Sequence, residues 1–314
     1  MIKRIGYYWN RDKEAVWSIA YRRKGQGKQS VLKDKTRPFM RFAVEKDFWA
    51  ADPLAVTHDG KDYLFYEYYD TKKEKGLLAC SVMEDGQLSK PKIILEEPFH
   101  LSFPFVFRVD NEYYMIPETG AVKQIILYKC MQFPYQWKKE RVLLEGVTSS
   151  DTIVFSKEGK LFLLASILKE GKATTAQNQL YTYDLSSHCL EYCCTAKETG
   201  EKGVRNGGGL FTDGEIWIRP GQNCTGGYGK SLLFFEVEQV DKEGYLEKVL
   251  AELSADEITI EGAAETFDGI HTYSSTEQYE YIDLKRIVKI PMAKRVCRMG
   301  KIFIGFIKGK LKRH

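Results

Sequence analysis

The sequence has no long apolar run, and this absence narrows the classes of protein to which the chain can belong. No stretch of about 18 uninterrupted apolar residues occurs, so no membrane-spanning helix is expected. Residues 1–6 carry two basic residues but lead into Tyr7-Tyr8-Trp9-Asn10, which is not the apolar core of a secretory signal. From the sequence alone we therefore expect a cytoplasmic protein.

The cysteines lack the paired spacing of a disulfide framework. There are seven, an odd number, and they are scattered from position 80 to position 297, which is typical of reduced thiols. His188 and Cys189 lie near Cys193 and Cys194, but the chain has no CxxC pair and no second ligand cluster. We therefore expect neither a metal site nor a resident cofactor.

Common catalytic signatures are also missing, because no GxSxG or HExxH motif occurs. The glycine-rich segments 207–209 and 226–229 precede expected strands rather than helices, so they are not expected to bind phosphate at a helix N-terminus. The first 284 residues carry 36 basic and 43 acidic residues. This acidic excess excludes a nucleic-acid partner, which would need clustered lysine and arginine.

What the sequence does contain is a repeated phrase. Three segments follow the same pattern, in which a two-residue turn comes seven positions after the start and an apolar strand follows the turn. They start at Asp52, Phe103 and Asp151. A weaker copy starts at Asn206. The copies start about 50 residues apart, and each is followed by two further short apolar segments. Four strands in each unit are typical of a propeller blade.

The repeat predicts an all-β fold, a five-bladed β-propeller over residues 1–284. The fifth unit, near residues 269–282, is short of strands, and the N-terminal segments 4–8 and 15–21 are expected to complete it and close the ring. Spacing alone also allows four or six blades. Residues 285–314 form a separate basic tail, which we expect to be helical.

The positions that vary between the copies should lie on one rim of the ring, because the first strand of a hairpin begins where the second ends. Asp52, Asp151 and Glu118 are our candidate catalytic residues, since glycosyl chemistry needs carboxyl groups on facing walls. An aspartate at a strand start can instead cap a turn. The candidate substrate-binding residues on or near the rim are Glu67, Asn206, Arg219, Gln222 and His271, with Trp49 for stacking on a sugar ring.

Arg219 breaks the pattern of the repeat. The equivalent positions of the other copies are Phe65, Ile116 and Leu164, and a charge at such a position is costly unless it is paired or hydrated. Two interpretations stay open. Arg219 either forms an ion pair with one of the rim carboxylates, Asp52, Glu118 or Asp151, or binds an anionic ligand.

Several phrases of the chain resemble a known family. His100-Leu101-Ser102-Phe103-Pro104-Phe105-Val106, Tyr113-Tyr114-Met115-Ile116-Pro117-Glu118-Thr119 and Gly269-Ile270-His271-Thr272 are similar to the N-terminal domain of plant glucosamine inositolphosphorylceramide transferase and its bacterial relatives. The chain resembles more distantly the five-bladed propeller glycosidases of the arabinanase and β-xylosidase type. The resemblance implies a propeller that acts in the assembly of surface glycans or glycolipids.

The resemblance also implies roles for individual residues. Such glycosidases are expected to use an aspartate base from blade one, a second aspartate from a middle blade and a glutamate acid from a later blade. Asp52 and Asp151 match the first two, but blade four has no glutamate at the expected place. This departure favours glycosyl transfer from a nucleotide sugar, with Arg219 as the cation for the diphosphate. Hydrolysis and glycan binding without catalysis stay open as alternatives.

The tail at residues 285–314 mixes eleven lysine or arginine residues with apolar ones and contains no acid. A segment of this kind suits the surface of an anionic membrane. It could equally form a helix that packs on the propeller and exposes its basic face. Membrane attachment would place the protein on the inner face of the membrane, where lipid-linked glycans are assembled.

Overall fold

The computed structural model describes residues 12–25, 30–170, 172 and 174–297. The chain separates into two compact units, Trp17–Leu284 and a unit formed by both chain ends, Met1–Val16 with Lys285–His314. The first unit contains all the candidate site residues. The second is described only over residues 12–16 and 285–297.

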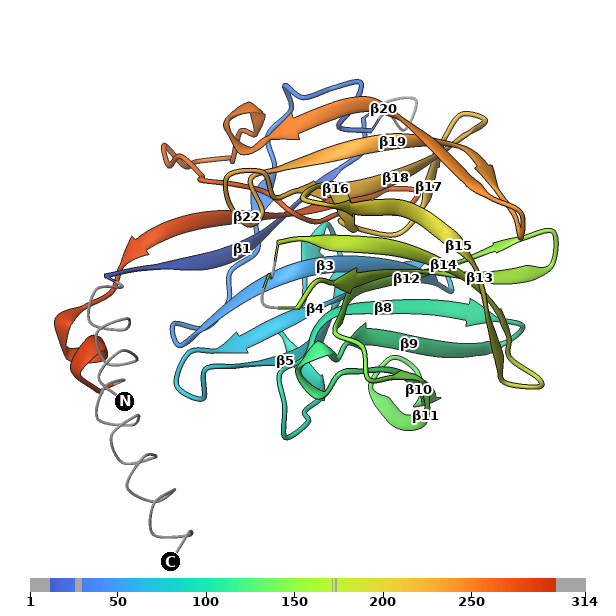
Figure 1. Ribbon diagram of the computed structural model, residues 1–314. Helices are drawn as coiled ribbons and strands as arrows, with labels where there is room; N and C mark the ends of the chain where they lie inside the picture. The colour runs from blue at the N-terminus through green and yellow to red at the C-terminus, as the bar shows by residue number, and fades with distance from the viewer. Residues whose placement is uncertain (1–11, 26–29, 171, 173, 298–314) are drawn as a thin grey trace, which may run out of the picture. The chain divides into compact units, whose positions relative to one another are not determined.

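The larger unit is a five-bladed β-propeller, as predicted, with one antiparallel sheet for each blade (Figure 1). Four blades are continuous in sequence and contain four or five strands each. The first comprises β3 (Phe48–His58), β4 (Lys61–Asp70), β5 (Lys75–Glu84), β6 (Gln87–Leu88) and β7 (Lys92–Leu95). The second comprises β8 (Ser102–Val109), β9 (Glu112–Glu118), β10 (Gln124–Gln132) and β11 (Gln136–Glu145). The third comprises β12 (Ser149–Lys157), β13 (Lys160–Leu168), β14 (Ala176–Asp184) and β15 (Cys189–Gly200).

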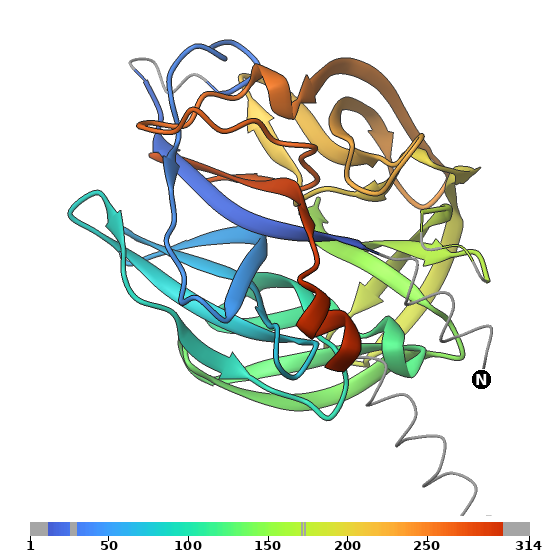
Figure 2. The same cartoon turned by 90° about the vertical axis from the view of Figure 1, so that its left-hand side faces the viewer.

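The fourth and fifth blades complete the ring. The fourth comprises β16 (Lys202–Asn206), β17 (Phe211–Asp213), β18 (Ile216–Asn223), β19 (Ser231–Val240) and β20 (Tyr245–Ser254). The fifth has the order β21 (Tyr273–Ser275), β22 (Tyr279–Lys289), β1 (Lys13–Arg23) and β2 (Met40–Arg41). Figure 2 shows β1, in blue, beside β22, in red. N-terminal strands therefore complete the last blade; the expected strand at residues 4–8 lies outside the described residues.

The repeated starting residues share an unusual backbone conformation. Asp52, Phe103 and Asp151 have φ angles of 53°, 44° and 48°. The pairing of strands 1 and 2 of each blade breaks at these residues, between Ala51 and Leu54 in the first blade and at the equivalent places in the next two. Each is therefore a β-bulge, which turns a side chain out of the regular alternation of the strand. A left-handed non-glycine residue costs about 1–3 kcal/mol and is typical of functional sites.

Apolar side chains of neighbouring blades pack against each other and position these bulges. Phe65 and Leu78 of the first blade pack with Met115 and Ile126 of the second in one buried cluster. Leu163 and Tyr181 of the third blade belong to another buried cluster that includes side chains of the second. Since a buried Leu, Ile or Phe contributes roughly 1.5–3 kcal/mol, these interfaces hold the inner strands in fixed positions.

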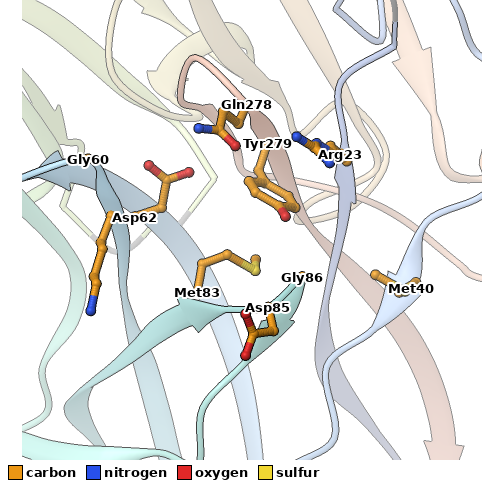
Figure 3. A pocket seen from close by; sticks show the side chains of 10 residues that line it. Arg23, Met40, Gly60, Asp62, Met83, Asp85, Gly86, Gln278 and Tyr279 are labelled. Atoms are coloured by element: carbon orange, nitrogen blue, oxygen red, sulfur yellow. The ribbon is translucent and has the colours of Figure 1, made fainter.

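A separate pocket of about 530 Å³ lies at the hairpin turns of the first and fifth blades, away from the bulges. It lies between the first and fifth blades, and Figure 3 shows Asp62, Met83 and Tyr279 among its lining side chains. Gly60, Gly86 and Gln278 belong to turns that lie at the far end of their hairpins from Asp52 and His271. The pocket is therefore not part of the rim that carries the candidate site residues.

The described part of the tail contains a short helix at residues 292–297, as predicted. Strand β22 first continues to Lys289, so the helix begins after the last blade has ended. Lys294 forms an ion pair with Glu14 at 2.7 Å within the unit made of the chain ends. Residues 298–314 of the predicted tail lie outside the described residues. Among the helices of the described part of the chain, none is long and apolar enough to cross a bilayer.

Candidate active site

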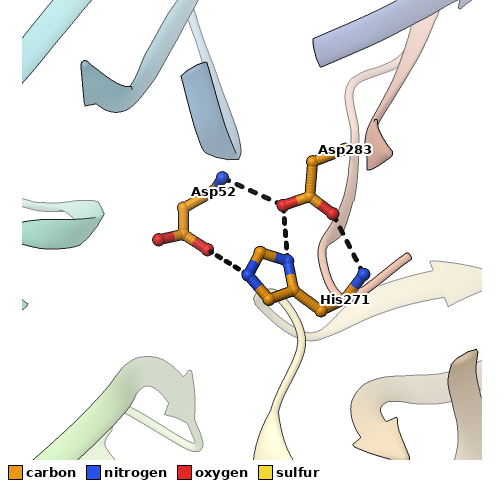
Figure 4. Close-up of side chains that lie close together, drawn as sticks. All are labelled: Asp52, His271 and Asp283. Carbon is orange, nitrogen blue, oxygen red and sulfur yellow. Dashed lines mark hydrogen bonds and ion pairs between the residues drawn. The ribbon is translucent and has the colours of Figure 1, made fainter. Parts of the chain in front are cut away.

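Asp52, His271 and Asp283 form the first half of the candidate site (Figure 4). Asp283 Oδ2 lies 2.5 Å from His271 Nδ1 and accepts a hydrogen bond from the backbone N–H of Asp52 at 3.1 Å. Its other oxygen accepts the backbone N–H groups of His271 and Thr272, both at 3.0 Å. His271 Nε2 lies 3.7 Å from Asp52 Oδ1. One buried carboxylate of β22 thus orients both the bulge of blade one and the histidine.

Asp52 itself is held at both carboxylate oxygens. Oδ2 accepts the backbone N–H of Phe103 at 3.0 Å, and Oδ1 accepts the hydroxyl of Thr272 at 3.0 Å. The ring of His271 stacks on Trp17 with 3.8 Å between the ring centroids, and Tyr228 lies edge-on at 5.1 Å. Bulges, backbone donors and aromatic rings together leave these groups little freedom of orientation.

The second half of the site is centred on Asp151 and Arg205. Asp151 Oδ2 accepts a hydrogen bond from Arg205 Nε at 2.7 Å and one from Gln222 Nε2 at 3.2 Å. The guanidinium of Arg205 also lies 3.6 Å from Glu118 Oε2 and 4.9 Å from the ring centre of Tyr228. The side chain of Glu118 is 21% exposed, and Tyr228 is also partly exposed. A ligand would therefore reach the cluster from their side.

The acids of the cluster have pKa values that differ from one another. Burial raises the pKa of Asp52 to about 6, with opposition from His271 and added repulsion from Asp283 and Asp151. Burial raises the pKa of Glu118 to about 8; the charge of Asp151 adds to this rise, and Arg205 opposes it. At neutral pH Asp52 is therefore mostly ionised and Glu118 mostly protonated, a pairing of base and acid that acid–base chemistry needs.

His271 is the basic group of the first half of the site. Burial works against its charged form, but the contact with Asp283 and the charges of Asp52 and Asp151 together outweigh burial and raise its pKa. Asp52, His271 and Asp283 also offer possible metal-ligand atoms within 4.8 Å of one another. Most of these atoms already hydrogen-bond to each other or to backbone N–H groups, so a cation would have to displace those bonds. The three residues fit a hydrogen-bonded network better than an open metal site.

Glu67 lies at the same rim, on β4, and is 5% exposed. Burial raises its pKa well above the usual range, and repulsion from Asp52, Glu118 and Asp283 adds to this effect. Trp49 does not contact this cluster through any described hydrogen bond or ring contact. Its ring stacks on Tyr69 at 4.3 Å, and Tyr69 lies 6.1 Å from the ring of His100.

Arg219 and Asn206 are fully buried, and both hydrogen-bond to groups of the protein. Both Nε and Nη2 of Arg219 donate to the carboxylate of Glu247 at 2.7 Å. The ion-pair alternative is the one seen, but its partner is none of the three rim acids proposed from the sequence. Asn206 donates to the backbone oxygens of Asp151 and Leu164 and accepts from Arg219, so it ties blade four to blade three.

Sequence reasoning missed three members of the cluster. Arg205 directly precedes Asn206, and the bulge at residues 202–206 makes the arginine, rather than the asparagine, face Asp151. Asp283 is an acid within the otherwise mostly apolar strand β22, a signal that could have been used. Tyr228 lies in a glycine-rich loop, where no pattern distinguishes a ligand-facing aromatic side chain from a solvent-exposed one.

Solved structures with a similar fold are glycoside hydrolases. The catalytic domain of a family-62 α-L-arabinofuranosidase from Coprinopsis cinerea aligns with a TM-score of 0.58 and 13% identity, over 82% of this chain and 83% of that one. A family-117 glycoside hydrolase from Zobellia galactanivorans aligns with a TM-score of 0.53 and 12% identity, over 86% and 90% of the two chains. At this level of identity, the similarity establishes the propeller fold alone.

Sequence relatives are more specific. Glucosamine inositolphosphorylceramide transferase 1 of Arabidopsis thaliana is 35% identical over 205 residues, which is 63% of this chain and 26% of the relative. The protein of the same name from Oryza sativa subsp. indica is 32% identical over 205 residues, or 63% of this chain and 27% of the relative. The match thus spans about a quarter of the length of these relatives. A family model described as "Glucosamine inositolphosphorylceramide transferase 1, N-terminal" matches residues 40–276, and the chain belongs to that family.

Proposed function

We propose that this propeller is a carbohydrate-active module that acts on a glycosidic bond at the cluster of Asp52, Glu118, Asp151 and Arg205. The observation that supports this function is the pair of carboxyl groups with separated pKa values, about 6 for Asp52 and about 8 for Glu118. In this proposal ionised Asp52 is the base or nucleophile, and protonated Glu118 gives its proton to the leaving oxygen. Glu118 would then supply the acid that blade four lacks.

The other polar groups would support this pair. Asp151 binds Arg205 and so keeps the guanidinium 3.6 Å from Glu118, where its charge stabilises the carboxylate that remains after proton transfer. Gln222 holds Asp151 from the other side. Tyr228, partly exposed above the guanidinium, is placed to contact a sugar ring.

The relatives are named as transferases, and this favours transfer of a sugar to an acceptor over its release to water. A nucleotide-sugar donor has less support, because Arg219 is buried against Glu247 and Arg205 is already paired with a carboxylate. We therefore favour a glycan or glycolipid as both donor and acceptor. Transfer from a nucleotide sugar is the second candidate, and glycan binding without catalysis is the third.

A comparison of ligands tests these alternatives. The purified chain is heated with nucleotide sugars, free monosaccharides and oligosaccharides, since only ligands of the native state raise the melting temperature. Oligosaccharides that stabilise the chain are then incubated with it, with and without a nucleotide sugar, and the products are analysed by mass spectrometry. Chain-length redistribution without a nucleotide supports the proposal. Elongation only with a nucleotide sugar, release of free sugar only, or binding without reaction each contradicts it.

Attachment to the inner face of an anionic membrane is also part of the proposal. The lysine and arginine residues beyond position 284 support it, because each cation near an anionic surface adds about 1 kcal/mol. Sedimentation with phosphatidylserine vesicles should retain the full chain and lose a chain ending at residue 290, which keeps the whole of strand β22. Equal sedimentation of both chains would contradict this part of the proposal.

A further inference from the structure

His100 lies between the first and second blades, and the site described so far does not use it. The backbone N–H of Gly76 donates to His100 Nδ1 at 3.0 Å, and the backbone N–H of Leu101 donates to the carbonyl oxygen of Gly76 at 3.2 Å. His100 and the residue after it therefore hydrogen-bond to both backbone groups of Gly76, which fixes the position of the imidazole. Because Nδ1 accepts a hydrogen bond, the neutral ring carries its proton on Nε2.

That Nε2 faces a buried acid. It lies 3.4 Å from Oε1 of Glu67, and this oxygen is shielded from solvent and has no aligned hydrogen bond to any described residue. The backbone packs tightly here, since a Cβ on Gly76 would lie 2.6 Å from Glu67 Oε1 and 2.8 Å from His100 Cε1. The side chain of His100 is 38% exposed, whereas that of Glu67 is 7% exposed. Contacts of this length often tighten when a ligand binds.

The charged groups around Glu67 are mostly acids. Asp52, Glu118 and Asp283 repel a charge on its carboxyl group, and burial and these charges together raise its pKa. His100 adds no positive charge, because burial lowers the pKa of the imidazole. Burial and these neighbours therefore favour the neutral, protonated form of Glu67.

We propose that Gly76 and His100 hold Glu67 as a neutral acid whose proton lies on Oε2, as a hydrogen-bond donor to a ligand of the carboxyl cluster. Oε1 faces an N–H donor and is therefore the carbonyl oxygen, so the acid proton belongs to Oε2. A neutral donor suits an ether or hydroxyl oxygen of a sugar and adds no charge to an acidic site. His100 is a positioning residue in this scheme. Only the choice of a sugar as ligand rests on the proposed function.

The test compares Glu67→Gln and Glu67→Met, with Glu84→Gln, an exposed glutamate of β5, as the matched control. Melting temperatures are measured from about pH 5 to about pH 8, and ¹⁵N NMR of the histidines gives the tautomer of His100. Unfolded wild-type chain loses the Glu67 proton as the pH rises, whereas folded chain keeps it, so wild-type stability falls across this range. Glu67→Gln has no titrating group at this position, so its stability lacks this fall with pH.

We expect the melting temperature of Glu67→Gln to rise relative to wild type as the pH increases, while Glu84→Gln shows no such trend. His100 should be the neutral Nε2–H tautomer in both wild type and Glu67→Gln. Glu67→Met leaves Nε2–H without an acceptor and should melt below Glu67→Gln at every pH. A protonated His100, its Nδ1–H tautomer, or a glutamine variant that loses stability relative to wild type with rising pH would overturn the proposal. No glycosyl assay is involved, so this result and that of the proposed function are independent.

Discussion

Asp151 Oδ2 accepts a hydrogen bond from Arg205 Nε at 2.7 Å, although the two residues belong to neighbouring blades. Both side chains are almost fully buried, at 1% and 6% exposure. An ion pair of this kind is costly to break from one side, because the remaining charge stays buried. The pair is therefore both a joint between blades three and four and the electrostatic support of Glu118.

Replacement of Arg205 tests this joint. Arg205→Met should lower the free energy of unfolding by about 3–5 kcal/mol, because Asp151 is left buried without its cation. Urea unfolding gives the change, and Arg141→Met, at an exposed arginine of β11, is the control with an expected change within about 0.5 kcal/mol. If Arg205→Met unfolds like the control, Arg205 does not hold the joint.

Replacement of Asp52, the aspartate at the first bulge, should separate chemistry from folding. Asn tolerates a left-handed backbone well, so Asp52→Asn should keep the β-bulge and change the melting temperature little. Asp151→Asn should also keep its bulge but lower the melting temperature, because it leaves Arg205 buried without its counter-charge. Turnover of the glycan substrate should fall by at least about a hundredfold, the usual loss when a general acid or base is removed. Full activity in folded Asp52→Asn would exclude Asp52 as a catalytic residue.

The activity should have a bell-shaped pH dependence. Asp52 must be ionised and Glu118 protonated, so the rate should rise with a pKa near 6 and fall with a pKa near 8. Arg205→Lys keeps a positive charge but loses the planar fork of the guanidinium, and it should therefore shift the upper limb. Rates measured across this range that continue to rise above pH about 8 would be inconsistent with Glu118 as the acid.

Glu118 should also link stability to pH. The folded chain binds its proton up to a pH of about 8, whereas the unfolded chain releases it near the ordinary value of 4.5, so the free energy of unfolding falls as the pH rises between these values. Glu118→Gln removes this contribution and should flatten the dependence. Denaturant unfolding near pH 4.5 and near pH 8 measures how much the free energy of unfolding of each protein changes with pH. An equal change in wild type and Glu118→Gln would contradict the raised pKa of Glu118.

The buried pair of Arg219 and Glu247 should be replaceable only as a pair. Arg219→Leu leaves largely buried Glu247 with one cation, Lys197 at 2.7 Å, in place of two, and should cost about 3 kcal/mol, the lower end for a broken buried pair. The double replacement Arg219→Leu with Glu247→Leu should recover most of this loss, because Lys197 is partly exposed and can be hydrated. The other blades already carry Phe65, Ile116 and Leu164 at this position. Urea unfolding curves of wild type, the single variant and the double variant give the three free energies of unfolding. A double variant as unstable as the single one would show that the charges stabilise the fold by more than their mutual pairing.

The repeat explains why so much of the architecture could be predicted from the sequence. Turn residues and apolar strands recur with a fixed period, so the blades and the shared rim of Asp52, Glu118 and Asp151 follow from local patterns. The β-bulges at the starting positions of the copies are visible only in the strand pairing. Partners that are distant in the sequence do not follow in this way. Glu247 lies in the same blade as Arg219 but two strands away, and Arg205 faces Asp151 of the neighbouring blade because of a bulge, so both depend on three-dimensional register.

The ring closes between strands from opposite ends of the chain, and this has a consequence for the timing of assembly. Trp17 of β1 stacks on His271, and Asp283 of β22 anchors Asp52, so the first and last segments of the propeller meet in the site. During synthesis on the ribosome, Asp52 is made long before its partners, and the four other blades can form while the site is still incomplete. The site is thus completed only when β1 pairs with β22. Under mild denaturation this pairing should open first, so the site should be lost while most of the sheet structure survives.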